Sequence, residues 1–143
     1  MFYAGAAVLG FSTVCDSYPH TVQIAQRYKE MCKGKDKNAI IVLGGPQASA
    51  VDLETLTNFP FIDFIVRGEG ELTFSEVIEK LETCESFADV RGITYREKVD
   101  GSTKIKRNPD RELIPDLDSL PIPAYHLYPI SENSDEIPLD IGR

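Results

Sequence analysis

The sequence has no long apolar run and no excess of basic residues. No stretch approaches the roughly 20 apolar residues that a membrane-spanning helix needs, and no charged leader precedes an apolar segment with a cleavage site. Lys and Arg number 15 against 23 Asp and Glu, which gives a net charge of −8. Such a surface repels phosphate backbones and anionic lipid. We therefore expect a cytoplasmic protein that binds neither nucleic acid nor membrane.

Metal-ligating residues are also scarce. The three cysteines, Cys15, Cys32 and Cys84, form no C-x-x-C and no Cys/His spacing typical of a zinc or iron-sulfur site, so we interpret them as reduced structural thiols. Cys15 differs from the other two because it follows an expected strand end, where ligands gather. His20 and His126 are interpreted as surface or packing residues.

Composition indicates one globular domain with a real core. The chain has 143 residues, of which 42% are hydrophobic and 27% charged. These proportions are ordinary for a folded protein and argue against wholesale disorder.

Three apolar segments without polar alternation, 4–13, 39–45 and 62–68, predict strands covered on both faces. A helical pattern follows each one: the first begins near Ser17 and Pro19 and stops at Gly34, and the second spans roughly 49–57. This alternation predicts an α/β fold, Rossmann-like or flavodoxin-like, with three layers around a parallel sheet.

The third helix carries the strongest start signal. Thr73 and Glu76 match a T-x-x-E capping box, and Leu72 and Val77 can form a hydrophobic staple. We expect this cap to fix where the helix begins and hence where the preceding G-E-G-E turn points.

The remainder predicts a β-hairpin and a proline-rich strap. Apolar alternation flanks Asp100-Gly101, a hairpin turn dipeptide, and the basic stretch Lys104, Lys106 and Arg107 is interpreted as the solvated face of an exposed strand. Six of the nine prolines follow, at Pro109, Pro115, Pro121, Pro123, Pro129 and Pro138. Proline lacks an amide donor, so this part should be extended. We expect a core at 1–88, a hairpin at 89–109 and a linker at 110–143.

Small residues gather where the three predicted strands end. In an open parallel sheet, ligands bind outside the carboxyl ends of the strands, and glycine lets the backbone approach a bulky ligand closely. The predicted binding residues are Ser12, Thr13, Gly44, Gly45, Pro46, Gly68, Glu69, Gly70 and Glu71.

A phosphate ligand fits these loops poorly. There is no G-x-x-x-x-G-K-[ST], and Glu69 and Glu71 would repel a pyrophosphate. Carboxylates accept hydrogen bonds from amides and hydroxyls, which favours a large ligand rich in such donors. Two alternatives stay open: a flavodoxin-like nucleotide-binding or signalling module, and a small enzyme that uses Glu69 and Glu71 as acid and base.

Five motifs occur in an order that resembles the amino-terminal region of radical SAM enzymes with a cobalamin-binding domain. They are LGFS, IVLGGPQAS, DFIVRGEGELTFSEVIEKL, VRGITYRE and NPDRELIPDLDSLPIPAYHLYPI, and together they cover nearly the whole chain. The resemblance implies that a Rossmann-like domain binds vitamin B12 along the nine residues named above, and that the D-L-D-S-L-P strap leads into a radical SAM domain.

The sequence departs from that family in three respects. It has no counterpart of the family's first strand, helix and strand, and it ends where the family places the C-x-x-x-C-x-x-C loop for a [4Fe-4S] cluster and S-adenosylmethionine. The D-x-H-x-x-G motif, which supplies a cobalt ligand in some cobalamin proteins, is also absent. The resemblance thus implies a non-catalytic fragment of a larger enzyme, a methyltransferase or a related one. The strand at 4–13 would then be an open edge, and we expect self-association through it.

Overall fold

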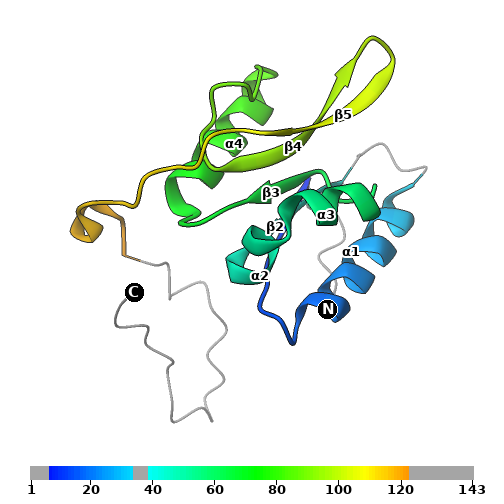
Figure 1. Cartoon of the computed structure of the whole chain (residues 1–143), viewed down its shortest axis with the longest axis horizontal. Helices are drawn as coiled ribbons and strands as arrows, with labels where there is room; N and C mark the ends of the chain where they lie inside the picture. The colour runs from blue at the N-terminus through cyan, green and yellow to red at the C-terminus, as the bar shows by residue number, and fades with distance from the viewer. Residues whose placement is uncertain (1–6, 34–38, 123–143) are drawn as a thin grey trace. The chain divides into compact units, whose positions relative to one another are not determined.

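The computed structural model describes residues 7–33 and 39–122. The chain divides into two compact units, Met1–Leu113 and Ile114–Arg143. The first unit contains a five-stranded sheet in which spatial order equals chain order: β1 (Val8–Ser12), β2 (Ile40–Gly44), β3 (Phe64–Val66), β4 (Ile93–Val99) and β5 (Ser102–Arg107) (Figure 1). The first three strands are parallel, and β4 and β5 are antiparallel.

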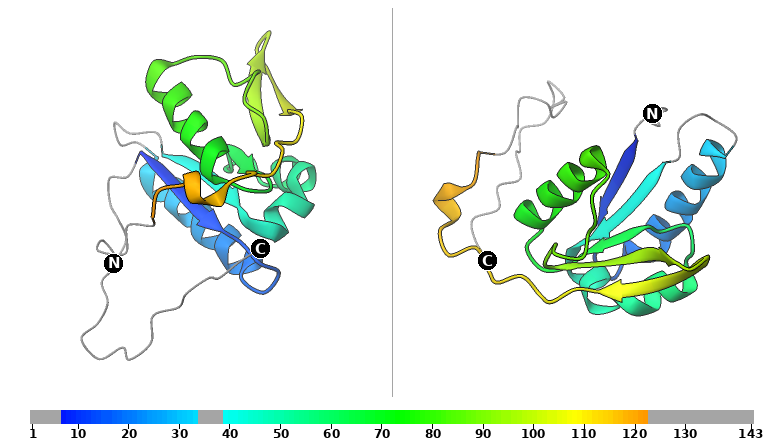
Figure 2. Two further views of the ribbon diagram at one scale, coloured as in Figure 1. Left: turned by 90° about the vertical axis from the view of Figure 1, so that its left-hand side faces the viewer. Right: turned by 90° about the horizontal axis from the view of Figure 1, so that it is seen from above.

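Helices cover both faces of this sheet, as Figure 2 shows. α1 (Tyr18–Cys32), α2 (Gly45–Ala50) and α3 (Asp52–Asn58) lie on one face, and α4 (Glu71–Thr83) lies on the other. Two apolar clusters fill the spaces between the layers. Ile41, Leu43 and Ile65 point toward α1, and Val42, Phe64 and Val66 point toward α4. The sequence prediction of a three-layer, Rossmann-like α/β fold is therefore confirmed.

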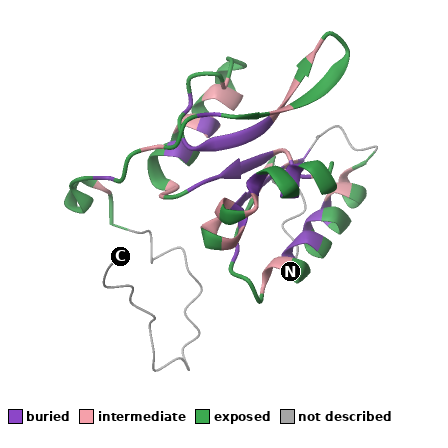
Figure 3. Cartoon of the chain, viewed as in Figure 1, coloured by how far each residue is buried: buried purple, intermediate pink, exposed green. Residues whose placement is uncertain are grey.

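The interior strands are the most deeply buried part of the molecule (Figure 3). Ile41, Leu43 and Ile65 are fully inaccessible to solvent, as a strand with helices on both sides requires. β1 differs from the expectation that it is covered on both faces. Its residues are half-buried or exposed, and a Cβ added to Gly10 would meet nothing within 4 Å, because β1 is the edge strand.

The start of α1 agrees with the sequence prediction. Ser17 is the N-cap residue and Pro19 lies in the first turn. Val22, Ala25 and Tyr28 form the buried stripe of the helix. The expected stop signal at Gly34 lies outside the described residues, and the helix ends at Cys32.

The predicted capping box of α4 is wrong. The helix begins at Glu71 after the N-cap residue Gly70, so Thr73 already lies inside its first turn. No side chain caps the helix. The T-x-x-E spacing misled the prediction because both side chains bond instead to Arg111, which lies 38 and 35 residues further along the chain.

Two short helices replace the predicted single helix at 49–57. α2 begins directly at Gly45, and the backbone breaks at Val51, where φ is −127° and ψ is 38°. Asp52 begins α3, and its buried carboxylate accepts a hydrogen bond from Thr94 of β4. A polar residue with a distant partner therefore sets the second helix boundary.

The hairpin forms as predicted and extends the sheet, since β4 pairs with β3. Asp100 and Gly101 both have positive φ, which suits a tight two-residue turn between twisted strands. All three residues of the basic stretch, Lys104, Lys106 and Arg107, are exposed, as interpreted, but two of them also form ion pairs. Lys106 pairs with Glu97, and Arg107 pairs with the buried carboxylate of Asp52.

The second unit contributes one short element to the described residues, a 3-10 turn at Leu117–Ser119 capped by the Asp116 side chain. Pro123, His126, Pro129 and Pro138 lie outside the described part of the chain. Within that part, no helix has the length and apolar character to span a bilayer.

Candidate functional site

The three strand ends that the sequence singled out meet at one edge of the sheet, which we call the carboxyl edge. Ser12 and Gly44 are paired in the parallel register of β1 and β2, and β3 pairs with β2 on its other side. α2 begins at this edge immediately after β2, and α4 begins there after the four residues 67–70 that follow β3. The predicted convergence of Ser12, Gly44 and Gly68 is therefore present in the fold.

Thr13 fastens the end of β1 to the start of α2. Its side chain is fully buried, and its hydroxyl donates to the Gly44 carbonyl at 2.8 Å and accepts from the Ala48 amide at 3.1 Å. Its backbone amide also donates to Gly44, and its carbonyl accepts from Gln47. These bonds keep the first two strand ends in register, leaving Ser12 exposed beside them.

Gly45 is required at its position for two reasons. Its φ is +86°, which disfavours any residue with a side chain. A Cβ there would also lie 2.6 Å from the Thr13 carbonyl oxygen and 2.7 Å from the Thr13 nitrogen. The backbone of the Gly44-Gly45 turn can therefore approach β1 only without a side chain, and Pro46 follows it, exposed, in the first turn of α2.

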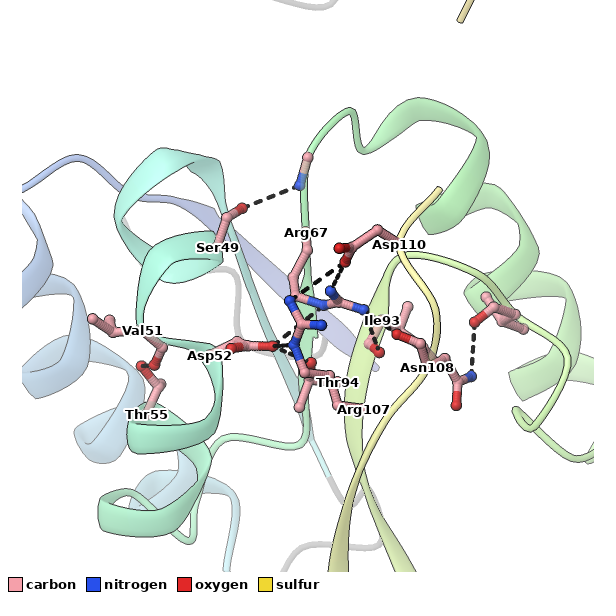
Figure 4. Close-up of polar contacts among 12 residues, drawn as sticks. Ser49, Val51, Asp52, Thr55, Arg67, Ile93, Thr94, Arg107, Asn108 and Asp110 are labelled. Atoms are coloured by element: carbon pink, nitrogen blue, oxygen red, sulfur yellow. Dashed lines mark hydrogen bonds and ion pairs between the residues drawn. The ribbon is translucent and has the colours of Figure 1, made fainter. Parts of the chain in front are cut away.

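Gly68 is an open glycine. Its φ is +69°, it is exposed, and a Cβ there would meet nothing within 4 Å. Its amide donates to Ser49 Oγ at 3.2 Å (Figure 4). The Ser49 hydroxyl donates in turn to the Gly45 carbonyl at 2.9 Å. Ser49 thus links the two glycine turns. The sequence analysis missed this residue, although its position four residues after Gly45 places it one helical turn above the first glycine turn.

The rest of the G-E-G-E turn leads into α4. Gly70 is the N-cap residue, and Glu71 occupies the first turn, where a carboxylate interacts favourably with the helix dipole. Glu69 is half-buried and Glu71 is exposed. Apolar side chains lie close by in sequence: Val14 follows Thr13, and Leu72 and Phe74 belong to the start of α4, all with at least 37% of their surface exposed.

A cluster of charges centred on the buried residues Arg67 and Asp52 lies directly beneath the Gly68 turn (Figure 4). Arg67, only 4% exposed, places its Nε 3.3 Å from Asp52 Oδ2, an ion pair without hydrogen-bond geometry. The same oxygen accepts hydrogen bonds from Thr94 Oγ1 at 2.5 Å and Arg107 Nε at 2.8 Å. This cluster was not predicted from the sequence, because its members come from α3, β4, β5 and the residue that follows β3.

Electrostatics hold the cluster in its ionised form. Burial alone raises the pKa of Asp52, but the hydrogen bonds from Thr94 and Arg107 outweigh burial and lower that pKa below its usual 3.8. Burial and the neighbouring Arg107 lower the pKa of Arg67, and Asp52 opposes this change. The carboxylate between the two guanidinium groups is therefore the residue on which the cluster depends.

The cysteines and His20 give no sign of a metal centre. All three cysteines are free thiols, but Cys15 and Cys84 are exposed and not packed in the core. Cys15 Sγ donates to Gln47 Oε1 at 3.0 Å beside the Gly44-Gly45 turn. His20 is exposed on α1. Among residues 7–33 and 39–122, no group of three or more His, Cys, Asp and Glu side chains could hold a metal ion.

A hollow of about 330 Å³ lies at the opposite, amino edge of the sheet. It lies between the last turns of α1 and the turn before β3, and is lined by Gln26, Lys29, Glu30, Lys33, Pro60 and Phe61. Among the described residues no glycine lines this hollow, so this part of the chain lacks the exposed backbone of the carboxyl edge.

Comparison with known proteins identifies the family. The model of the B12 binding domain matches residues 4–78, more than half of the chain and all of β1 to β3. This protein belongs to the B12-binding domain family. The match confirms the resemblance drawn from the sequence motifs. It also covers all three strand ends and both glycine turns of the carboxyl edge.

Relatives of this B12-binding domain are much longer proteins. An uncharacterized methyltransferase of Pyrococcus horikoshii is 34% identical over 113 residues, which are 78% of this chain and 24% of the relative. The anaerobic magnesium-protoporphyrin IX monomethyl ester cyclase of Rubrivivax gelatinosus is 30% identical over 109 residues, 74% of this chain and 19% of the relative. The chain thus spans about a quarter or less of their length.

A solved structure has the same fold. The cobalamin-dependent S-adenosylmethionine radical enzyme OxsB, determined with aqua-cobalamin and S-adenosylmethionine bound, superposes with a TM-score of 0.61. The likeness covers 74% of this chain and 14% of OxsB, at 24% sequence identity.

Proposed function

We propose that the carboxyl edge of this B12-binding domain binds cobalamin. The observation that carries the proposal is the convergence of Ser12, Gly44 and Gly68 on one edge, with small residues at all three strand ends. Ligands of open α/β sheets bind at this edge. Membership of the family supports the same ligand.

The residues at this edge fit a broad, flat, amide-rich molecule. Gly68 leaves open space above its backbone, and a corrin ring needs such close approach. Ser12, Glu69 and Glu71 are suited to meet the donors of the amide side chains, and Val14, Leu72 and Phe74 offer apolar surface. Cobalamin, when bound, supplies a cobalt centre that can accept and transfer a methyl group.

We further propose that this domain serves a larger cytoplasmic enzyme of the radical SAM type, a methyltransferase or a related one. The small share of each relative that the chain covers supports this proposal. The fold that the chain shares with OxsB, a cobalamin-dependent S-adenosylmethionine radical enzyme, supports it as well. The [4Fe-4S] cluster and S-adenosylmethionine would belong to another domain, which this domain would contact through its proline-rich strap. Reading the gene beyond Arg143 for three closely spaced cysteines tests the proposal.

Gel filtration with hydroxocobalamin tests the binding site. We expect the protein at high micromolar concentration to retain the corrin and to shift its absorption spectrum. Gly68→Val should reduce retention at least tenfold, because the new side chain occupies the open space. Gly101→Val is the matched control, since Gly101 also has positive φ and open surroundings but lies in the hairpin turn. Loss of binding in both variants, or no retention by the wild type, would contradict the proposal.

The edge strand supports a second, separate proposal, that two copies associate through β1. Within the described residues β1 pairs on one side only, and its sequence carries no charge to discourage pairing. Light scattering across a concentration series should show a rising mean mass. A constant monomer mass at high concentration contradicts this association.

A further inference from the structure

The chain leaves the sheet through a four-residue stretch, Asn108–Arg111, which we call the exit segment. Its backbone is joined to β3 through a single glycine. The Gly92 amide donates to the Pro109 carbonyl at 2.8 Å, and the Arg67 amide donates to the Gly92 carbonyl at 2.8 Å. The exit segment and the end of β3 are therefore only two hydrogen bonds apart.

Side chains tie the exit segment to the residue just before the Gly68 turn. Arg67 donates to the Asn108 carbonyl at 2.5 Å and bonds to the Asp110 carboxylate (Figure 4). Arg107 also lies within ion-pair distance of Asp110, at 3.4 Å. Asn108 is itself buried and donates to the carbonyls of Phe87 and Val90.

Other side chains tie the same segment to the residues just after the turn. Arg111 Nε donates to Thr73 Oγ1 at 2.8 Å, and its terminal nitrogen donates to Glu76 Oε2 at 2.5 Å. Thr73 is fully buried and donates in turn to the Arg91 carbonyl. The first two turns of α4 are thus bonded to the exit segment.

Gly92 lies where these groups meet, and its lack of a side chain permits the close packing. Its φ is +81°. A Cβ there would lie 2.9 Å from Thr73 Oγ1, 3.3 Å from the Arg111 Cβ and 3.5 Å from the Arg67 carbonyl oxygen. No other residue type lets β3, α4 and the exit segment approach one another this closely.

We propose that the exit segment positions the Gly68–Gly70 turn and couples it to the chain that follows. The turn has two anchors, Arg67 before it and Thr73 with Glu76 after it, and both are bonded to the same four residues. Any movement that pulls Arg111 from α4 therefore frees one anchor of the turn. The ligand-dependent part of this inference rests on the proposed cobalamin site.

Coupling between two sites is reciprocal. If release of the exit segment loosens the turn and weakens cobalamin binding, bound cobalamin must hold the exit segment in place to the same degree. The residues that continue from Arg111 toward another domain would then sense whether the corrin is present. Arg111 and Glu76 act through the turn and are positioning residues.

Glu76→Gln is the variant that tests the coupling, because the Glu76 side chain is 42% exposed and its loss leaves the core intact. Glu85→Gln is the matched control, since Glu85 makes an ion pair with Lys80 near the other end of α4. In hydrogen exchange without ligand, we expect exchange in residues 67–74 and 107–113 to rise about two- to fivefold in Glu76→Gln and to stay unchanged in Glu85→Gln.

The second measurement uses hydroxocobalamin and trypsin. Cleavage after Arg111 requires its side chain to leave Thr73 and Glu76, so the rate reports release of the exit segment. We expect hydroxocobalamin to slow this cleavage in the wild type, and Glu76→Gln to weaken hydroxocobalamin binding about two- to fivefold. Mass spectrometry distinguishes this cut from others.

The two measurements separate the two proposals. Exchange that rises in the exit segment but not in the turn, or that rises throughout the protein, overturns the coupling whether or not cobalamin binds. Binding of hydroxocobalamin with equal affinity by Glu76→Gln and Glu85→Gln also overturns it. If the wild type binds no hydroxocobalamin, the proposed function of the isolated chain fails, and the exchange measurement alone decides the coupling.

Discussion

The two edges of the sheet are built from opposite kinds of residue. At the amino edge, long charged side chains fasten the helices: Arg96 donates to the carbonyls of Leu56, Phe59 and Ile62, and Lys29 bonds to the Ala39 carbonyl and to Asp63. At the carboxyl edge, Ser12, Gly44 and Gly68 leave the backbone bare. Long charged side chains secure one edge at its surface, whereas at the other edge the strand ends are bare and the side chains that secure them lie below the surface.

This difference separates stability from binding in space. Arg96 satisfies carbonyls at the end of α3 that the helix itself leaves unpaired. The carboxyl edge gains its order from short bonds below the surface, through Thr13, Ser49 and the Arg67 cluster. A change at the amino edge should therefore affect folding alone. A change at the carboxyl edge should affect both folding and ligand binding, in proportions that depend on how deeply the changed residue is buried.

Gly45→Ala is expected to have the largest effect on stability. The added Cβ would lie 2.6 Å from the Thr13 carbonyl oxygen, in a residue with φ of +86°, so backbone must move. We expect the free energy of unfolding in urea to fall by about 3–5 kcal/mol. Gly10→Ala, whose Cβ meets nothing within 4 Å, should change it by less than about 1 kcal/mol. Equal losses in the two variants would show that close approach at Gly45 is unimportant.

Asp52→Asn tests the buried cluster under the carboxyl edge. It leaves Arg67 without its buried counter-charge, so we expect a loss of about 3 kcal/mol above roughly pH 5. Because the folded state lowers the Asp52 pKa below 3.8, the stability that it contributes is present above that value and is lost as pH falls through the folded pKa. The difference between wild type and variant should therefore shrink below pH 3.8.

Urea unfolding curves between pH 2 and pH 7, measured on both proteins, check this dependence. Asp100→Asn, at the exposed hairpin turn, is the control and should show no such change. A difference between wild type and Asp52→Asn that is independent of pH would mean that the Asp52 charge does not stabilise the fold.

Arg96→Met removes the main fastening of the amino edge. We expect a loss of about 2–3 kcal/mol, because three carbonyls lose a charged donor. Hydroxocobalamin affinity of the folded protein should stay within about twofold, since the change lies at the other edge. Lys98→Met, exposed on the same strand, serves as the reference. A large fall in affinity would break the separation of the two edges.

Lys29→Met is expected to have the smallest effect. Lys29 Nζ lies 2.6 Å from Asp63 Oδ2, and that oxygen also accepts from the Ile41 amide. The pair is partly exposed, so we expect a loss of about 1 kcal/mol in thermal or urea unfolding. Arg27→Met, on the exposed face of the same helix, should be near neutral. Losses above 3 kcal/mol would indicate that the amino edge depends on this pair more than on Arg96.

The sequence analysis predicted those parts of the fold that depend on local pattern. Continuous apolar runs marked β2 and β3, Ser17 and Pro19 marked the start of α1, and Asp100-Gly101 marked the hairpin. Each of these signals acts over a few residues. The glycine turns were predicted for the same reason, because an apolar run followed directly by glycine is visible in adjacent residues of the sequence.

The parts that were missed or mistaken depend on distant residues. Arg67 reads as the polar end of a strand, and only the fold places it between Asp52 and Asp110. Thr73 and Glu76 match a local cap, but Arg111 takes both side chains. Ser49 bridges the turns at Gly45 and Gly68, which are 23 residues apart in the sequence. No periodicity or spacing in one sequence records such pairings.

The order of strands in the sheet has a consequence for how the protein folds during its synthesis. Within the described residues, each strand after β1 pairs with its predecessor in the chain, so none of these five strands has to be inserted between two that are already joined. A polypeptide emerging from the ribosome can add its strands one after another. Each new strand pairs with one that is near it in the sequence, which favours rapid folding. Few unpaired apolar strands are then exposed to solvent during folding.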